Sequence, residues 1–236
     1  MSIEQLAYTD GDAALTGLLV RPAGKARAAV VVFPTIMNAT QSVIDKAGDL
    51  AANGYLALVA DFYGKTPETM DQSREYAMEI RATPQAYRQR LRAALKALAV
   101  LPEAAGIPIG TIGFCMGGQA ALELARDGAP MFVAASFHGL LGTDLPAEPG
   151  VVTARVLVCH GDADPMVRRE QVLRFWEEMD AAGANWHFHS YAGVKHGFTN
   201  PQAGSGPNPN PATAYDASAD RQSWAAMYSL FDEVLG

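Results

Sequence analysis

Apolar residues fall into short runs that alternate with segments of helical spacing. Six mostly apolar runs predict strands at residues 28–34, 55–60, 107–114, 131–137, 155–160 and 185–191. Between and after them, apolar positions recur every three or four residues and predict helices at 41–53, 73–81, 85–100, 116–126, 168–182 and 216–235. Strands that alternate with helices indicate right-handed crossovers and a mostly parallel sheet with helices on both faces. The predicted class is therefore α/β.

The amino end follows a different pattern. Residues 4–21 form two strand-like halves around Asp10-Gly11-Asp12, which predicts an antiparallel hairpin. No repeat or linker interrupts the chain, and its 236 residues fit one α/β domain. We therefore expect a single domain over residues 1–236. An apolar fraction of 49% with 18% charged residues is typical of a globular rather than a disordered protein.

The charge balance and the apolar runs exclude some classes of binding partner. A formal net charge of −7 without a basic stripe argues against binding to nucleic acid. The longest near-pure apolar run, 28–33, is too short to cross a bilayer, so no membrane association is expected. Residues 1–8 lack the basic and apolar regions of a secretory signal. The expected location is the cytoplasm, where Cys115 and Cys159 would be thiols.

The strongest chemical signal is the sequence GFCMGG at 113–118, between a predicted strand and a predicted helix. It has the form of a nucleophile elbow with Cys115 in place of serine. Such a turn lifts the central side chain above the sheet, and the flanking glycines leave room for the chain to double back. The N-terminus of the following helix would stabilise a thiolate. The structural alternative is a small buried cysteine in a tight turn.

A nucleophile of this kind needs an orienting acid and a base, in the chain order nucleophile, acid, histidine. The predicted strand 155–160 continues into HGDADPMV (160–167), so Asp162 and Asp164 follow its carboxyl end, where open α/β sheets place their ligands. After the next helix and strand, His196 stands in the loop sequence KHGF (195–198). We predict Cys115 as nucleophile and His196 as base, with either aspartate as the acid.

These motifs resemble the dienelactone hydrolase family of α/β-hydrolases. The similarity extends from Ala28 to Leu235, and its specific marks are GFCMGG, HGDADPMV, KHGF and the stretch DFYG at 61–64. The resemblance implies an α/β-hydrolase fold and a Cys-Asp-His triad whose acid is the aspartate before proline, Asp164. Asp162 would then bond backbone amides in the same turn. The resemblance also implies an oxyanion hole formed by the backbone N–H groups of Ile36 and Met116.

Two positions depart from the family pattern. Thr35 stands where the family has a glutamate that contacts the cysteine, and Asn200 stands where it has an arginine that holds a substrate carboxylate. The triad is intact, but a dienelactone is not favoured as the substrate. Other candidate pocket residues, besides Thr35, are Tyr63, His138, Phe198 and Tyr215. For His138, a hydrogen-bonded histidine that merely ends a strand is an equal alternative.

We therefore expect hydrolysis of a small ester-like molecule through a covalent acyl-enzyme, with no cofactor and no metal. The substrate would be an activated ester, enol ester, lactone or thioester. His187 and His189 share one strand face but lack a third metal ligand. Two other functions stay open: a non-catalytic binding or redox-sensing protein on a hydrolase scaffold, and an acyltransferase. A monomer or a small homo-oligomer is expected.

One segment breaks the regular pattern close to His196. Residues 201–211 contain four prolines and two glycines, which favour an extended chain with bends and cannot build a core. Long loops inside a compact domain are either solvated or functional. The functional hypothesis is a pocket rim that selects substrates by size.

Overall fold

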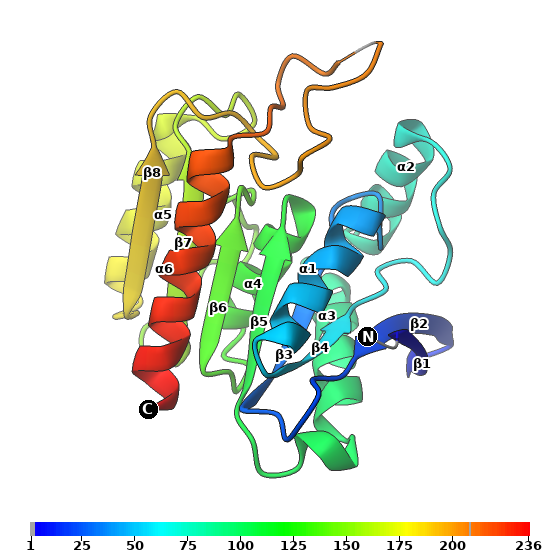
Figure 1. Cartoon of the computed structure of the whole chain (residues 1–236). Helices are drawn as coiled ribbons and strands as arrows, with labels where there is room; N and C mark the ends of the chain where they lie inside the picture. The colour runs from blue at the N-terminus through cyan, green and yellow to red at the C-terminus, as the bar shows by residue number, and fades with distance from the viewer. Residues whose placement is uncertain (1–2, 208) are drawn as a thin grey trace. The chain divides into compact units, whose positions relative to one another are not determined.

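The computed structural model describes residues 3–207 and 209–236 (Figure 1). Asn208 in the proline-rich segment lies outside the described residues, as do Met1 and Ser2 at the amino end. Within the described residues, eight strands form one sheet, which is mostly parallel as predicted. By internal contacts the chain divides into two compact units, Met1–Ile112 and Gly113–Gly236. The expectation of a single domain stays a prediction.

The sheet strands of the first unit follow the order β1-β2-β4-β3. The hairpin is confirmed: β1 (Ile3–Asp10) and β2 (Ala13–Val20) pair in antiparallel register along their whole length. β2 also pairs antiparallel with β4 (Tyr55–Val59), which in turn pairs in parallel with β3 (Ala28–Phe33). Every residue of β3 is buried, in keeping with its unbroken apolar sequence.

Three α-helices and a short 3₁₀ turn complete the first unit. They are α1 (Gln41–Ala52), α2 (Met70–Ile80), α3 (Pro84–Ala99) and η1 (Pro102–Ala104). Figure 1 shows α1 and α3 on opposite faces of β3 and β4. α2 begins three residues earlier than predicted, because the Thr69 side chain accepts a hydrogen bond from the Gln72 amide and caps the helix. Pro84 is the first residue of α3 rather than a spacer, a position where its missing N–H costs nothing.

β5 (Ile109–Phe114) leads into the second unit, and α4 (Met116–Arg126) follows Cys115 directly. There β6 (Val133–Phe137), β7 (Arg155–Gly161) and β8 (Trp186–Tyr191) pair in parallel in this order. The remaining helices are α5 (Arg169–Ala181) and α6 (Ala217–Leu235), which cover opposite faces of these strands (Figure 1). The carboxyl ends of β6 and β7 and the loop after β8 therefore lie at one edge of this unit.

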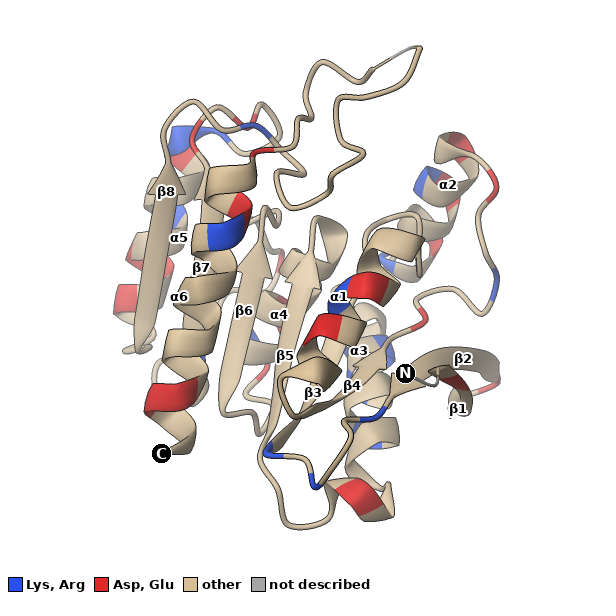
Figure 2. Ribbon diagram, in the orientation of Figure 1, with Lys and Arg blue, Asp and Glu red and all other residues tan. Residues whose placement is uncertain are grey.

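Charged side chains are scattered over helices and loops. Figure 2 shows acidic and basic residues interspersed along the ribbon of residues 3–207 and 209–236. Within the same ranges, no helix has the length and apolar character needed to span a membrane.

Candidate active site

The turn between β5 and α4 holds Cys115 in a strained backbone conformation. Its φ of 58° and ψ of −117° lie in a region that favours glycine, and its side chain is partly exposed. A Cβ atom on Gly113 would collide with the carbonyl group of Gly117, and one on Gly118 would lie 2.6 Å from Ser136 Oγ. These glycines therefore allow the chain to reverse sharply at Cys115. The carbonyl of Cys115 accepts the first amide bonds of α4, so the thiol stands at a helix N-terminus.

The structure brings His196 and Asp164 together. His196 Nδ1 lies 2.7 Å from Asp164 Oδ2, and the two residues are only 3% and 4% exposed. The other carboxylate oxygen of Asp164 accepts a hydrogen bond of 2.8 Å from the Met166 amide. Because Asp164 accepts from Nδ1, the imidazole keeps Nε2 for a second partner.

The turn that carries Asp164 is anchored to the loop that carries His196. The Ala163 amide donates to the Val194 carbonyl at 2.9 Å. Gly161 is required at this crossing, since a Cβ atom there would meet the carbonyl groups of Val194 and Lys195. The acid and the base are thus positioned by adjoining backbone segments.

Asp162 differs from the sequence expectation. The sequence predicts that it bonds amides within its own turn, but its carboxylate oxygens accept two hydrogen bonds from Arg169, at 2.6 and 3.1 Å. That ion pair lowers the pKa of the Asp162 carboxyl. The amide of the turn is bonded by Asp164 instead. Arg169 stands at the start of α5, where no sequence rule singled it out as a partner.

The electrostatics around His196 favour its protonated form. Burial lowers the pKa of the imidazole, but the hydrogen bond with Asp164 and the negative charges of Cys115 and Asp164 raise it to about 10. The cysteine at the elbow therefore acts on the same ring as the buried aspartate. An imidazolium–thiolate pair requires such an electrostatic interaction between the cysteine and the histidine.

His138 also lies beside these residues. Its Nδ1 accepts a hydrogen bond of 3.2 Å from the Cys115 amide, and its Nε2 lies 3.0 Å from Thr199 Oγ1. Its ring centroid is 5.1 Å from that of His196 and 5.2 Å from that of Phe198. The sequence predicts His138 and Phe198 as pocket residues but does not indicate Thr199. The only available signal for Thr199 was its place three residues after His196.

In the first unit, Ile36 belongs to a turn that begins right after β3. The Asn38 amide donates to the Thr35 carbonyl at 2.9 Å, and the Met37 amide donates to Thr35 Oγ1 at 3.3 Å. Tyr63 donates its hydroxyl to the Ile36 carbonyl at 3.0 Å. Across residues 3–207 and 209–236, no hydrogen bond engages the Ile36 N–H. Thr35 and Tyr63 thus shape the loop that carries this amide.

A buried carboxylate holds that turn in place. Asp61, 8% exposed, accepts hydrogen bonds from the Thr16 amide, Asn38 Nδ2 and the amides of Tyr63 and Gly64, all at 2.8–2.9 Å. Asn38 Oδ1 in turn accepts from the Phe62 amide at 3.2 Å. The DFYG stretch therefore organises the loop after β3 through direct hydrogen bonds.

Comparison with known proteins agrees with this architecture. A model of the dienelactone hydrolase family matches residues 15–235. A Bradyrhizobium sp protein named "Probable 2-oxo-3-(5-oxofuran-2-ylidene)propanoate lactonase" is 31% identical over 203 residues, 80% of this chain and 81% of that protein. The chain belongs to the dienelactone hydrolase family. It is thereby a member of a hydrolase family with the α/β-hydrolase fold.

Two further relatives extend the match. A solved dienelactone hydrolase-like promiscuous phosphotriesterase from metagenomic libraries is 34% identical with a TM-score of 0.93, covering 100% of this chain and 99% of that one. An uncharacterized protein of Caenorhabditis elegans is 37% identical over 151 residues, 61% of this chain and 92% of that protein. The fold of this dienelactone hydrolase family member is thus shared over its whole length with a solved structure.

The segment after His196 returns to pair with it in this family member. The His196 amide donates to the Ala212 carbonyl at 3.3 Å, and the Ala214 amide donates to the His196 carbonyl at 3.1 Å. Thr213 thereby forms a parallel bridge with His196. Asn200, at the position of the family arginine, accepts from the Gln202 amide at 3.0 Å and begins the excursion. We call Ala212–Thr213–Ala214 the return limb.

The remaining candidates lie in different settings. Tyr215, 40% exposed, follows the return limb, and its amide donates to the Ala203 carbonyl at 3.2 Å. Cys159 is buried in β7, and burial raises the pKa of its thiol to about 12. His187 and His189 are exposed on β8. In the part of the chain that is described, no three His, Cys, Asp or Glu side chains are grouped so as to hold a metal.

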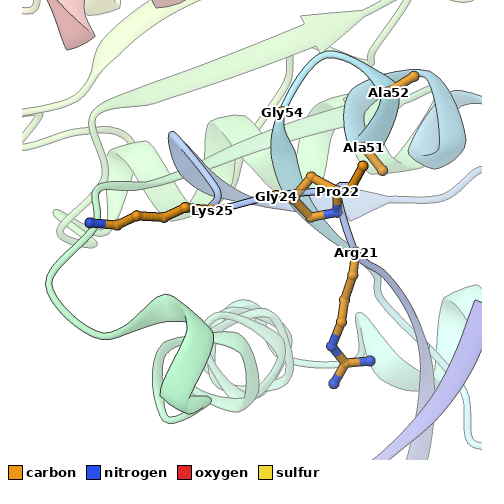
Figure 3. Close-up of a pocket in the computed structure, with 8 residues that line it drawn as sticks. Arg21, Pro22, Gly24, Lys25, Ala51, Ala52 and Gly54 are labelled. Atoms are coloured by element: carbon orange, nitrogen blue, oxygen red, sulfur yellow. The ribbon is translucent and has the colours of Figure 1, made fainter.

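A pocket in the first unit contains none of the predicted site residues. Its volume is about 760 Å³, and Figure 3 shows the residues that line it: Arg21, Pro22, Ala23, Gly24, Lys25, Ala51, Ala52 and Gly54. The guanidinium of Arg21 is engaged by Glu4 and Glu103 at 2.6 and 2.8 Å. The Arg21 guanidinium is therefore already paired with carboxylates.

Proposed function

We propose that this dienelactone hydrolase family member hydrolyses small activated esters, enol esters, lactones or thioesters through Cys115, His196 and Asp164. The observation that carries the proposal is the buried 2.7 Å contact between His196 Nδ1 and Asp164, on a ring that also interacts with Cys115. Family membership and a relative named as a lactonase support the same reaction class. We place the enzyme in the cytoplasm, acting on a small molecule.

In the first half-reaction, the Cys115 thiolate adds to the substrate carbonyl carbon. The resulting oxyanion accepts hydrogen bonds from the N–H groups of Met116 and Ile36. The role of the Ile36 amide is proposed from the family membership of the chain. The adduct collapses when the C–O or C–S bond breaks, His196 gives its proton to the leaving group, and a thioester stays on Cys115.

The second half-reaction needs His196 as a base. Its raised pKa depends partly on Cys115. Acylation converts the sulfur to a neutral thioester and removes that contribution, so the imidazole gives up its proton more readily. A neutral His196 can then take a proton from water, which attacks the thioester and releases the acid. Asp164 keeps Nδ1 protonated throughout, so that Nε2 is the reacting nitrogen.

The choice of sulfur limits the substrates. A thiolate is a better leaving group than an alkoxide, so an adduct with a poor leaving group reverts to substrate rather than going forward. We therefore expect activated esters, lactones and thioesters to react and amides to resist. Phosphotriester hydrolysis is a second candidate, because a solved relative of matching length carries that activity in its name.

The test is a panel of p-nitrophenyl esters, small lactones, thioesters and one aryl phosphotriester, assayed with wild type and Cys115→Ala. We expect turnover by wild type and its loss in Cys115→Ala, with Cys159→Ala as the matched control that keeps activity. Iodoacetamide labelling with peptide mapping should modify Cys115 and spare the buried Cys159. No turnover of any substrate would favour a binding or redox-sensing protein, and turnover only with added alcohol or amine would favour an acyltransferase.

A further inference from the structure

His138 is fixed between the two loops that carry the nucleophile and the base. It follows β6 directly with a positive φ of 42°, and its amide donates to the Cys159 carbonyl at 2.8 Å. The next residue, Gly139, is packed so tightly that a Cβ atom there would collide with Ser136 Oγ. The backbone that carries the imidazole is therefore held in place.

The hydrogen bonds of His138 determine its tautomer. A backbone N–H can only donate, so Nδ1, 3.2 Å from the Cys115 amide, carries no proton. The proton of the neutral ring is then on Nε2, which donates to Thr199 Oγ1 at 3.0 Å. One ring thus accepts from the residue that bears the thiol and donates to a residue three positions beyond His196.

The ring also touches the base itself. His138 meets His196 edge to face, with 5.1 Å between centroids and an interplanar angle of 69°. It meets Phe198 in the same way, at 5.2 Å and 79°. His196, Phe198 and Thr199 lie on one short stretch of chain, so His138 contacts that stretch at three points.

We propose that His138 is a positioning residue that sets the distance and angle between the Cys115 sulfur and His196 Nε2. It does so as a neutral ring that ties the elbow amide to the Thr199 hydroxyl while it packs against His196. The inference rests on the proposed function of Cys115 and His196. Proton transfer between sulfur and nitrogen depends steeply on their separation, and a shift of about 1 Å can cost about 100-fold in rate.

Four substitutions separate the parts of this role. His138→Phe keeps a ring but removes both hydrogen bonds. His138→Asn places an oxygen near the position of Nδ1, so it keeps the bond to the Cys115 amide and loses the one to Thr199. Thr199→Val removes only the hydroxyl, and Thr199→Ser retains it. His189→Asn on the exposed strand β8 is the matched control.

Two readouts are needed for each variant, together with its thermal midpoint. The first is kcat and KM with the best ester of the panel. The second is the rate of iodoacetamide labelling at Cys115 from pH 5 to 10, which reports the thiol–imidazole pair without any substrate. A purely structural role for His138 would lower the thermal midpoint but leave the labelling profile of the folded protein unchanged.

We expect His138→Phe to lower kcat roughly 10- to 100-fold with little change in KM, and to alter the labelling profile. Thr199→Val and His138→Asn should show smaller losses of similar size, and their double variant no more than either alone, because both remove one bond. Thr199→Ser and His189→Asn should behave as wild type. Wild-type labelling profiles in the folded His138 and Thr199 variants would overturn the inference, even if Cys115→Ala had confirmed the nucleophile.

Discussion

Two turns at strand ends each contain a buried aspartate, and their hydrogen bonds differ in kind. Asp61, after β4, accepts from three backbone amides and one side-chain amide. Asp164, after β7, accepts a hydrogen bond from a backbone amide with one oxygen, and its other oxygen bonds the His196 ring. The first carboxylate is saturated by donors that do not titrate. The second is directed at a group that changes its charge.

The comparison separates a carboxylate that is bonded by amides from a carboxylate that is bonded to a titratable ring. Amide donors fix a loop around a carboxylate, but they can neither accept nor release a proton near neutral pH. An imidazole partner can do both. The nature of the donors therefore distinguishes the two aspartates better than burial does, since both are nearly inaccessible.

Of the changes that test the difference between the two aspartates, we expect Asp164→Asn to have the largest effect, and this effect is on turnover. Asp164→Asn should lower kcat by roughly 10²–10⁴-fold, because the imidazole loses the carboxylate that fixes its tautomer and stabilises its charge. Asp162→Asn is the matched control, since its carboxylate binds the exposed Arg169 rather than the His196 ring. Steady-state kinetics on both variants decide the matter. The reverse pattern would show that Asp162 is the acid.

The corresponding change in the other turn should act on stability. Asp61→Asn leaves buried amide donors without a full set of acceptors and should lower the free energy of unfolding by roughly 1–3 kcal/mol. Urea denaturation at pH 7 measures this loss. Labelling of Cys115 in the folded protein should stay at the wild-type rate. An unchanged urea midpoint would show that the amides around Asp61 find other partners.

The effects of the two aspartates on the free energy of unfolding should also differ in their pH dependence. The pKa of His196 is about 10 in the folded protein and near 6.5 when it is unperturbed, so folding favours the imidazolium. Its contribution is complete below about pH 6.5 and is lost as the pH rises through about 10. The difference in unfolding free energy between wild type and Asp164→Asn should therefore shrink from pH 6 to pH 10. The difference between wild type and Asp61→Asn should stay constant, and a parallel change in both would contradict the assignment.

The smallest effect concerns the proline-rich excursion, whose ends are fixed. Deleting residues 205–209 leaves the contacts of Ala203 with Tyr215 and of Asn210 with Ala212 and Thr213. If the excursion forms the pocket rim, kcat/KM should change by several-fold more for bulky than for small acyl groups. A Gly/Ser replacement of equal length controls for composition. Uniform kinetics across the panel would show that the excursion only connects.

Much of the fold could be predicted because strand and helix signals are local. Every predicted strand and helix has a counterpart, and α4 has the predicted bounds. The shifted ends arise from capping, as at Thr69, and from proline at a first helical position, as at Pro84. The elbow could be predicted because its glycines lie close together in the sequence. The contacts of Asp162 with Arg169 and of His138 with Thr199 could not be predicted, because each depends on where two separate segments meet.

The parallel bridge between His196 and Thr213 determines which part of the excursion can accept insertions. The histidine is secured on both sides of its peptide by the return limb, so the tip of the excursion can lengthen or diversify without displacing the imidazole. Insertions near Gly206 would enlarge the surface beside His196 while the position of the imidazole is kept. The segment is thus a natural place for new specificities to evolve, or for a laboratory to graft a binding peptide.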